Sequence, residues 1–219
     1  MTTADILIWI VFLGGAPALL WWLYQSNRQR TRALAAWAQA RGWSFHDRDE
    51  TLRTVLTAIP FTYGKRHTAA EVMRGPSTDR EALSWRHMRS TIMAGGRKHT
   101  SWHVVGLRLT HRAPAIVQLV PNALLQSLPA GPVAEAQLAT GDTLFDQRWR
   151  AYTNDAAALP RLLPPTARDT LRDWTTPPDL IALRAEGDLL VGWFPGEPRV
   201  ERIDPTLDVL HRWARAIER

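Results

Sequence analysis

The chain has 219 residues, of which 45% are hydrophobic and 22% charged, with a formal net charge of +6. This composition is typical of a folded protein and excludes a disordered chain. Because there is no cysteine, disulfides, thiolate metal sites and cysteine nucleophiles are excluded as well.

The first predicted element is an apolar stretch of 19 residues, Ile6 to Tyr24, without a charged side chain. At about 1.5 Å per residue, a helix of this length spans roughly the 30 Å hydrocarbon layer of a bilayer. A buried core helix would carry a polar face at helical spacing, and a cleaved signal peptide would need a basic start and a small-residue cleavage site. Neither pattern is present, so the sequence predicts a transmembrane helix over residues 6–24 after a short extracytoplasmic segment over residues 1–5.

Basic residues follow this stretch and none precede it, which by the positive-inside bias places the remainder of the chain in the cytoplasm. The predicted location is therefore the cell (inner) membrane, with a single pass and the amino terminus outside. A basic juxtamembrane helix is predicted over residues 25–42, ending at Gly42. The residues predicted to anchor it at the lipid surface are aromatic or basic, with the arginines contacting anionic head groups: Trp21, Trp22, Tyr24, Arg28, Arg30 and Arg32.

Small residues within the apolar stretch provide a possible packing surface for another helix. These are Gly14, Gly15 and Ala18. Simple flexibility of the glycines is the alternative interpretation.

Residues 43–219 are predicted to form one α+β domain with a mostly antiparallel sheet and a C-terminal amphipathic helix. Alternating apolar residues and short turns predict strands over 43–47, 67–75, 81–91, 99–110 and 114–121, with further strand segments over 137–142 and 146–155. Helical spacing predicts helices over 48–59, over 155–176 in two pieces, and over 204–219. A hairpin is predicted over 180–196, turning around Gly187.

Several segments, "LAAWAQARGW", "LFDQRWRAYTND", "AEGDLLVGW" and the closing helix, occur here in an order that resembles an uncharacterised family. It is a family of small single-pass membrane proteins of unknown function from high-GC Gram-positive (actinobacterial) bacteria. The resemblance implies the topology given above and no catalytic residue.

Histidines in the predicted strands are the main candidates for chemistry, because imidazole is a common metal ligand. His99 and His103 lie four residues apart on one strand, and His87 could meet them from a neighbouring strand. No acidic residue accompanies them in sequence, so scattered histidines outside any metal site are the favoured interpretation. A Ser84, His87 and Asp146 arrangement lacks the sequence motif of a nucleophile elbow.

No catalytic residue, metal or cofactor is therefore predicted. "AGGRKHTS" lacks the spacing of a phosphate-binding loop, and no nucleic-acid-binding motif is present. The leading hypothesis is a membrane-anchored protein whose cytoplasmic domain binds a protein or lipid partner without catalysis. One alternative is a membrane-associated hydrolase or metal-dependent enzyme using His103 and His87. The other is an accessory subunit of a larger membrane complex, packed through Gly14, Gly15 and Ala18.

Overall fold

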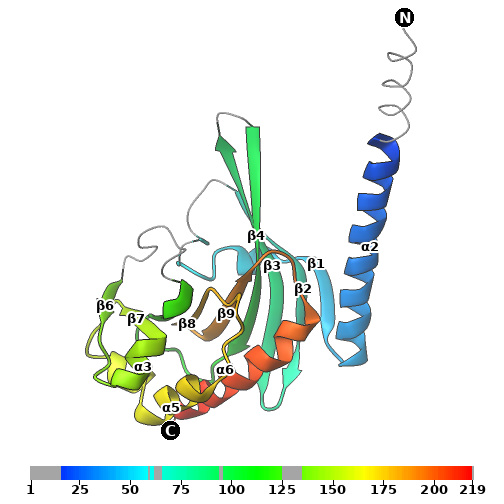
Figure 1. Cartoon of the computed structure of the whole chain (residues 1–219). Coiled ribbons are helices and arrows are strands. Elements are labelled where there is room, and N and C mark those ends of the chain that lie inside the picture. The colour runs from blue at the N-terminus through cyan, green and yellow to red at the C-terminus, as the bar shows by residue number, and fades with distance from the viewer. Residues whose placement is uncertain (1–15, 59, 62–65, 94–95, 125–134, 219) are drawn as a thin grey trace, which may run out of the picture.

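The computed structural model describes residues 16–58, 60–61, 66–93, 96–124 and 135–218 (Figure 1). The strands are β1 (Ser44–Arg48), β2 (Arg66–Ser77), β3 (Arg80–Met93), β4 (Gly96–Arg108), β5 (Val117–Pro121), β6 (Ala136–Leu138), β7 (Trp149–Thr153), β8 (Ala182–Glu186) and β9 (Leu189–Pro195). The α-helices are α2 (Ala16–Ala40), α3 (Thr143–Arg148), α4 (Leu159–Leu162), α5 (Pro165–Asp173) and α6 (Ile203–Ile217). Short 3-10 turns cover Glu50–Arg53, Asn122–Leu124 and Val200–Arg202.

All nine strands belong to one sheet with the order β1-β2-β3-β4-β9-β8-β5-β7-β6, and every neighbouring pair is antiparallel. The three long strands β2, β3 and β4 follow one another directly, because short turns can join antiparallel strands. The hairpin of β8 and β9 then pairs with the far side of β4, where Val104 lies opposite Trp193. This hairpin lies where the sequence predicts it.

Both faces of the sheet are covered, because strand residues alternate between two apolar clusters. On one face, α6 contributes Leu207, Leu210, Trp213 and Ala214, all buried and all on the face predicted from their spacing. On the other face, the segment after β1 supplies Leu52, Leu56 and Phe61 against Trp85 and Trp193. A polar strand residue therefore faces one of these two clusters and cannot reach the other.

Helix α2 lies beside β1 and β2 along its C-terminal half, and its N-terminal end projects clear of the sheet (Figure 1). Among the side chains of this helix that the structure describes, Leu34 and Ala38 are buried. The helix is followed by Gly42, whose φ of +70° reverses the direction of the chain. The next residue, Trp43, is buried against Gly75 of β2.

The prediction of a transmembrane helix over residues 6–24 is wrong. In the part of the chain that the structure describes, no helix is long and apolar enough to cross a membrane. The apolar part of α2 that is described, Ala16 to Tyr24, covers about 14 Å at 1.5 Å per residue, less than half of a hydrocarbon layer. Gln25, Asn27 and Arg28 then continue the same helix. The single-pass location in the cell membrane depended on that span and is corrected with it; residues 6–15 lie outside the described residues.

Two further differences concern helices. A helix was predicted over residues 48–59 from the spacing of Leu52 and Leu56. The described part of this segment, residues 48–58, contains only a 3-10 turn over Glu50–Arg53, and the N–H of Thr57 donates to the carboxylate of Glu186 on β8 and not to a helical carbonyl. Residues 146–148, predicted as the start of a strand segment, belong instead to α3, because the side chain of Asp142 accepts a hydrogen bond from the Phe145 N–H at 3.1 Å and caps the helix.

Candidate functional site

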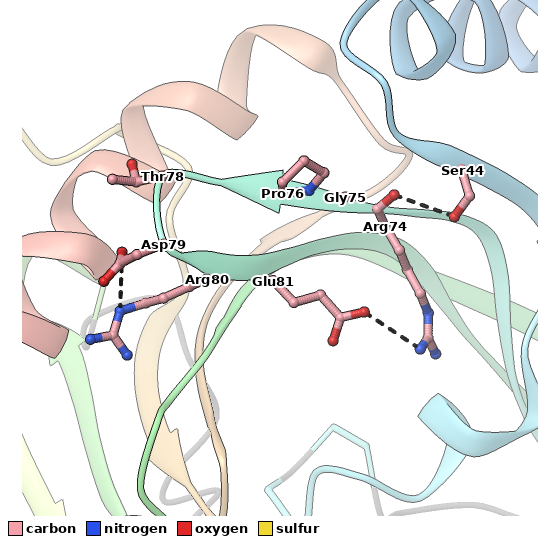
Figure 2. Close-up of a pocket in the computed structure, with 8 residues that line it drawn as sticks. All are labelled: Ser44, Arg74, Gly75, Pro76, Thr78, Asp79, Arg80 and Glu81. Carbon is pink, nitrogen blue, oxygen red and sulfur yellow. Dashed lines mark hydrogen bonds and ion pairs between the residues drawn. The ribbon is translucent and has the colours of Figure 1, made fainter.

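An open depression of about 670 Å³ lies beside the turn between β2 and β3 (Figure 2). Its charged side chains are already paired. Arg74 binds the carboxylate of Asp49 and lies 4.0 Å from Glu81, and Glu81 also accepts from Arg108 at 2.7 Å. Hydrogen bonds from Thr51 and from Arg74 hold the pKa of Asp49 below its usual range. An incoming anion would have to displace these carboxylates, so the arrangement supports the turn and offers no free cation to a ligand.

The neighbouring arginine in the same depression has the same role. Arg80 lies 3.7 Å from Asp79 and also binds Glu218, which follows α6. The hydrogen bond that Arg80 donates to the carboxylate of Glu218 raises the pKa of Arg80. Burial would raise the pKa of Glu218, but hydrogen bonds from Arg80 and from the Thr110 N–H outweigh it, and the pKa is lowered. These contacts fasten the end of the chain to the sheet.

Ser84 and His103 form a hydrogen-bonded pair that resembles a nucleophile with its base. Ser84 Oγ lies 2.9 Å from His103 Nε2, and both residues are fully buried. The backbone N–H of Arg199 donates to His103 Nδ1 at 3.3 Å, so the neutral ring carries its proton on Nε2 and donates it to Ser84. A general base needs its lone pair on the hydroxyl proton, and a nucleophile needs access to substrate. The pair meets neither condition and is a buried structural contact.

His87 lies on the other face of the sheet from His103. It sits opposite Trp102 in the register, whereas His103 sits opposite Arg86, so the two rings point to opposite faces. His87 Nε2 lies 3.0 Å from Nδ1 of His67, and the edge of the Phe61 ring packs against it at a centroid distance of 4.7 Å. Burial, and then the positive charges of His67 and Arg89, lower the pKa of His87 to about 3.

The three histidines singled out as metal candidates are therefore not brought together. His99 is exposed and lies opposite Ser90 near the free end of the β3–β4 hairpin. It shares a face with His103, but four strand residues separate them by about 13 Å. Among the described residues, no group of three or more His, Asp or Glu lies close enough to hold a metal ion. The contact between His67 and His87 joins β2 to β3. The sequence did not predict this contact, because no motif around His67 marks it as a partner of His87.

The projecting end of α2 is the third candidate site. Among the described residues, five large hydrophobic side chains are exposed. Four of them belong to a single six-residue segment of α2, residues 19–24. They are Leu19 (56% exposed), Trp21 (65%), Trp22 (61%) and Tyr24 (61%). A concentration of exposed apolar side chains, and of aromatic ones in particular, is typical of interaction surfaces.

The residues predicted to anchor the chain divide into two groups in the structure. Arg28 and Arg32 are exposed on α2 and pair with no carboxylate among the described residues. Arg30 instead turns toward the sheet, where it binds Glu71 at 2.9 and 2.6 Å and Glu197 at 3.2 Å. Ala18 lies within α2, while Gly14 and Gly15 lie outside the described residues.

The fold and the candidate sites define an antiparallel α+β domain with a projecting amino-terminal helix. No protein-family model matches the chain, and no curated protein matches it either. Among solved structures, the fold is similar to that of the mycobacterial trehalose monomycolate transport factor A, TtfA. The TM-score is 0.63 and the identity 14%, over 85% of this chain and 93% of that chain. This likeness shows a shared fold with an actinobacterial protein, and it does not show a family.

Proposed function

We propose that this protein is an accessory factor without catalysis of its own, which binds a protein partner through the projecting end of α2. The observation that carries the proposal is the exposed group Leu19, Trp21, Trp22 and Tyr24. Tryptophan and tyrosine provide large contact areas at low entropic cost and are enriched at binding hot spots. The fold neighbour, a transport factor, supports an accessory role.

The directions of these side chains indicate what kind of surface would bury them. At about 100° per residue, Leu19, Tyr24, Trp21 and Trp22 are spread around the circumference of the helix. A flat surface would cover only part of this set. A groove or bundle of the partner that surrounds the helix would cover all four, with Arg28 and Arg32 at its rim.

The buried histidines support the absence of catalysis. The Ser84–His103 pair is sealed from solvent, and the proton of the ring points at the hydroxyl that a base would have to deprotonate. The hydrolase hypothesis that used His103 and His87 together would need both rings on one face of the sheet, and they lie on opposite faces.

The test uses the full chain in its native cells, with a photo-crosslinking amino acid in place of Trp22. The same substitution at Gln147, an exposed residue of α3, is the control. Discrete protein adducts at position 22 and none at position 147 are expected. Adducts with lipid alone would assign the arginines and aromatic residues to anionic head groups and contradict a protein partner. The absence of any adduct at position 22 would also contradict the proposal.

A further inference from the structure

Strands β3 and β4 continue past the other strands as a two-stranded ribbon that projects from the sheet (Figure 1). On one side of the ribbon, the pairing of β3 with β2 ends at Ser90, opposite Arg66. On the other side, the pairing of β4 with β9 ends at Trp102, opposite Pro195. From Gly96 to Thr100, β3 is therefore the only strand that pairs with β4 in the described part of the chain.

The outer edge of this part of β4 carries backbone groups that can still form hydrogen bonds. The carbonyl of Ser101 accepts the N–H of Gly196 at 2.9 Å, so Ser101 turns its backbone groups toward this edge. Because the direction of these groups alternates along an antiparallel strand, those of His99 face the same edge, where no described strand pairs with them. From Gly96 to Thr100 the edge runs about 14 Å, at roughly 3.4 Å per residue. Such an edge is a template for one further strand.

The ribbon is positively charged, and its own strands provide no acidic residue to balance the charge. From residue 82 to residue 134, the sequence contains neither Asp nor Glu. Lys98 is exposed in the middle of the open edge, and Arg66 is exposed at the start of β2. Neither has a carboxylate partner among the described residues. Glu197, which follows β9, is already bound to two arginines, at 3.2 and 2.7 Å. The charge of Lys98 is therefore free to meet an acidic side chain of a partner.

The open edge and the charge together select among occupants. A second copy paired edge to edge through β4 would bring Lys98 and His99 of the two copies together without a carboxylate, which is unfavourable. A lysine in an edge strand discourages pairing with neutral or basic strands as well. An extended segment with acidic side chains satisfies the backbone groups and also places a carboxylate beside Lys98.

We infer that the outer edge of β4, from Gly96 to Thr100, binds an extended, acidic segment of another protein by β-strand addition. The segment continues the line of β9 in the sheet and exchanges backbone hydrogen bonds with His99. An acidic side chain beside Lys98 gives the preference for sequence. This surface is separate from the exposed end of α2, so the inference goes beyond the proposed function and does not depend on it.

The test adds short synthetic peptides to the purified full chain. The first peptide alternates Thr and Glu, which gives an extended strand with one acidic face. The second has the same sequence with every backbone nitrogen methylated, so that it keeps the charges and loses the donors. In the third, Lys replaces Glu. By NMR titration, we expect the first peptide to bind at least about tenfold more tightly than either of the others. It should also slow the hydrogen exchange of the His99 N–H at least about tenfold.

Charge reversal on the edge provides a second readout. Lys98→Glu should weaken the binding of the Thr–Glu peptide at least about tenfold. Arg112→Glu, which changes an exposed arginine between β4 and β5, is the control and should change the affinity less than about twofold. Both positions are exposed, so both variants should remain folded.

Three results overturn the inference. The first is the absence of binding by the Thr–Glu peptide, and the second is equal binding by its methylated form, which would show attraction of charge without strand pairing. The third is binding of the chain to vesicles that contain phosphatidylglycerol, lost in Lys98→Glu, while the peptide does not bind. That result would assign the ribbon to a lipid surface.

Discussion

Arg30 of α2 and Glu71 of β2 form a bidentate ion pair that joins the projecting helix to the sheet, with hydrogen bonds of 2.9 and 2.6 Å. Glu71 has a φ of +51° and lies where the register of β2 against β3 shifts, between Ala70 and Met73. Such a bulge re-aims a side chain, and here the buried carboxylate reaches Arg30 on one side and Arg86, at 3.2 Å, on the other. The contact fixes the direction in which the end of α2 leaves the domain.

Removing the charge of Glu71 should therefore destabilise the protein. In Glu71→Gln the shape is kept, but Arg30 and Arg86 lose the more buried of the two carboxylates that they share, and only Glu197 remains. We expect the free energy of unfolding to fall by about 2–3 kcal/mol, near the low end for breaking a buried ion pair because the arginines are partly exposed. Urea unfolding measures this. Arg28→Gln is the control and should change the value by less than about 0.5 kcal/mol; a similarly small change in Glu71→Gln would contradict the account.

Acid should destabilise the protein through two of its buried histidines, His87 and His103. Burial, and then nearby positive charges, lower the pKa of His87 and of His103 from 6.5 to about 3. Between these values the unfolded chain binds more protons than the folded one, so stability is complete above pH 6.5 and is lost as the pH falls toward 3. Each histidine should contribute a slope of up to about 1.4 kcal/mol per pH unit in the free energy of unfolding.

The variant His103→Gln separates this effect from that of other groups. Its amide N–H can still donate to Ser84, but the side chain does not titrate. We expect the slope between pH 6 and 4.5 to fall by about 1 kcal/mol per pH unit, measured by urea unfolding at each pH. His99→Gln, at an exposed position, should keep the slope of the unmodified chain; an unchanged slope in His103→Gln would show that the buried ring does not control acid unfolding.

Gly75, beside the depression in Figure 2, should tolerate no side chain. A Cβ at this position would lie 2.2 Å from Cδ1 of Trp43, whose indole N–H is held by the carbonyl of Pro76 at 3.1 Å. Gly75→Ala should lower the free energy of unfolding by about 1–3 kcal/mol, because the buried ring must shift. Calorimetry or urea unfolding measures this change. The double variant with Trp43→Leu should cost less than the two single changes added together; strict additivity would count against the clash.

Local patterns predicted the parts of the fold that depend on neighbouring residues. The alternation in β2, β3 and β4, the turn at Gly187 and the apolar face of α6 are all readable within about fifteen residues. The capped start of α3 at Asp142 carried a readable signal as well, since a side chain that accepts from the N–H three residues later is typical of a helix start. The apolar run was instead weighed on its length, its lack of a polar face and its basic flank, and the described helix that contains its second half becomes polar from Gln25.

The candidate sites depended on contacts that sequence spacing does not reveal. Arg30 and Glu71 are 41 residues apart, and the role of Arg30 follows from a bulge in β2 that no pattern marks. The separation of His87 from His103 depends on the register between β3 and β4, because a shift by one residue would exchange the faces. The aromatic residues Trp21, Trp22 and Tyr24 were predicted to anchor the chain at the lipid surface; the structure shows that they are exposed on α2.

The most direct test of the account is a purified triple variant, Trp21→Ser, Trp22→Ser and Tyr24→Ser, compared with the unmodified chain in two measurements. All three side chains are exposed, so the free energy of unfolding should change by less than about 0.5 kcal/mol each. The affinity for the protein crosslinked at position 22 should fall at least 100-fold, because the aromatic contacts are lost while the domain remains folded. Unchanged affinity in a folded triple variant would show that the end of α2 is not the binding element.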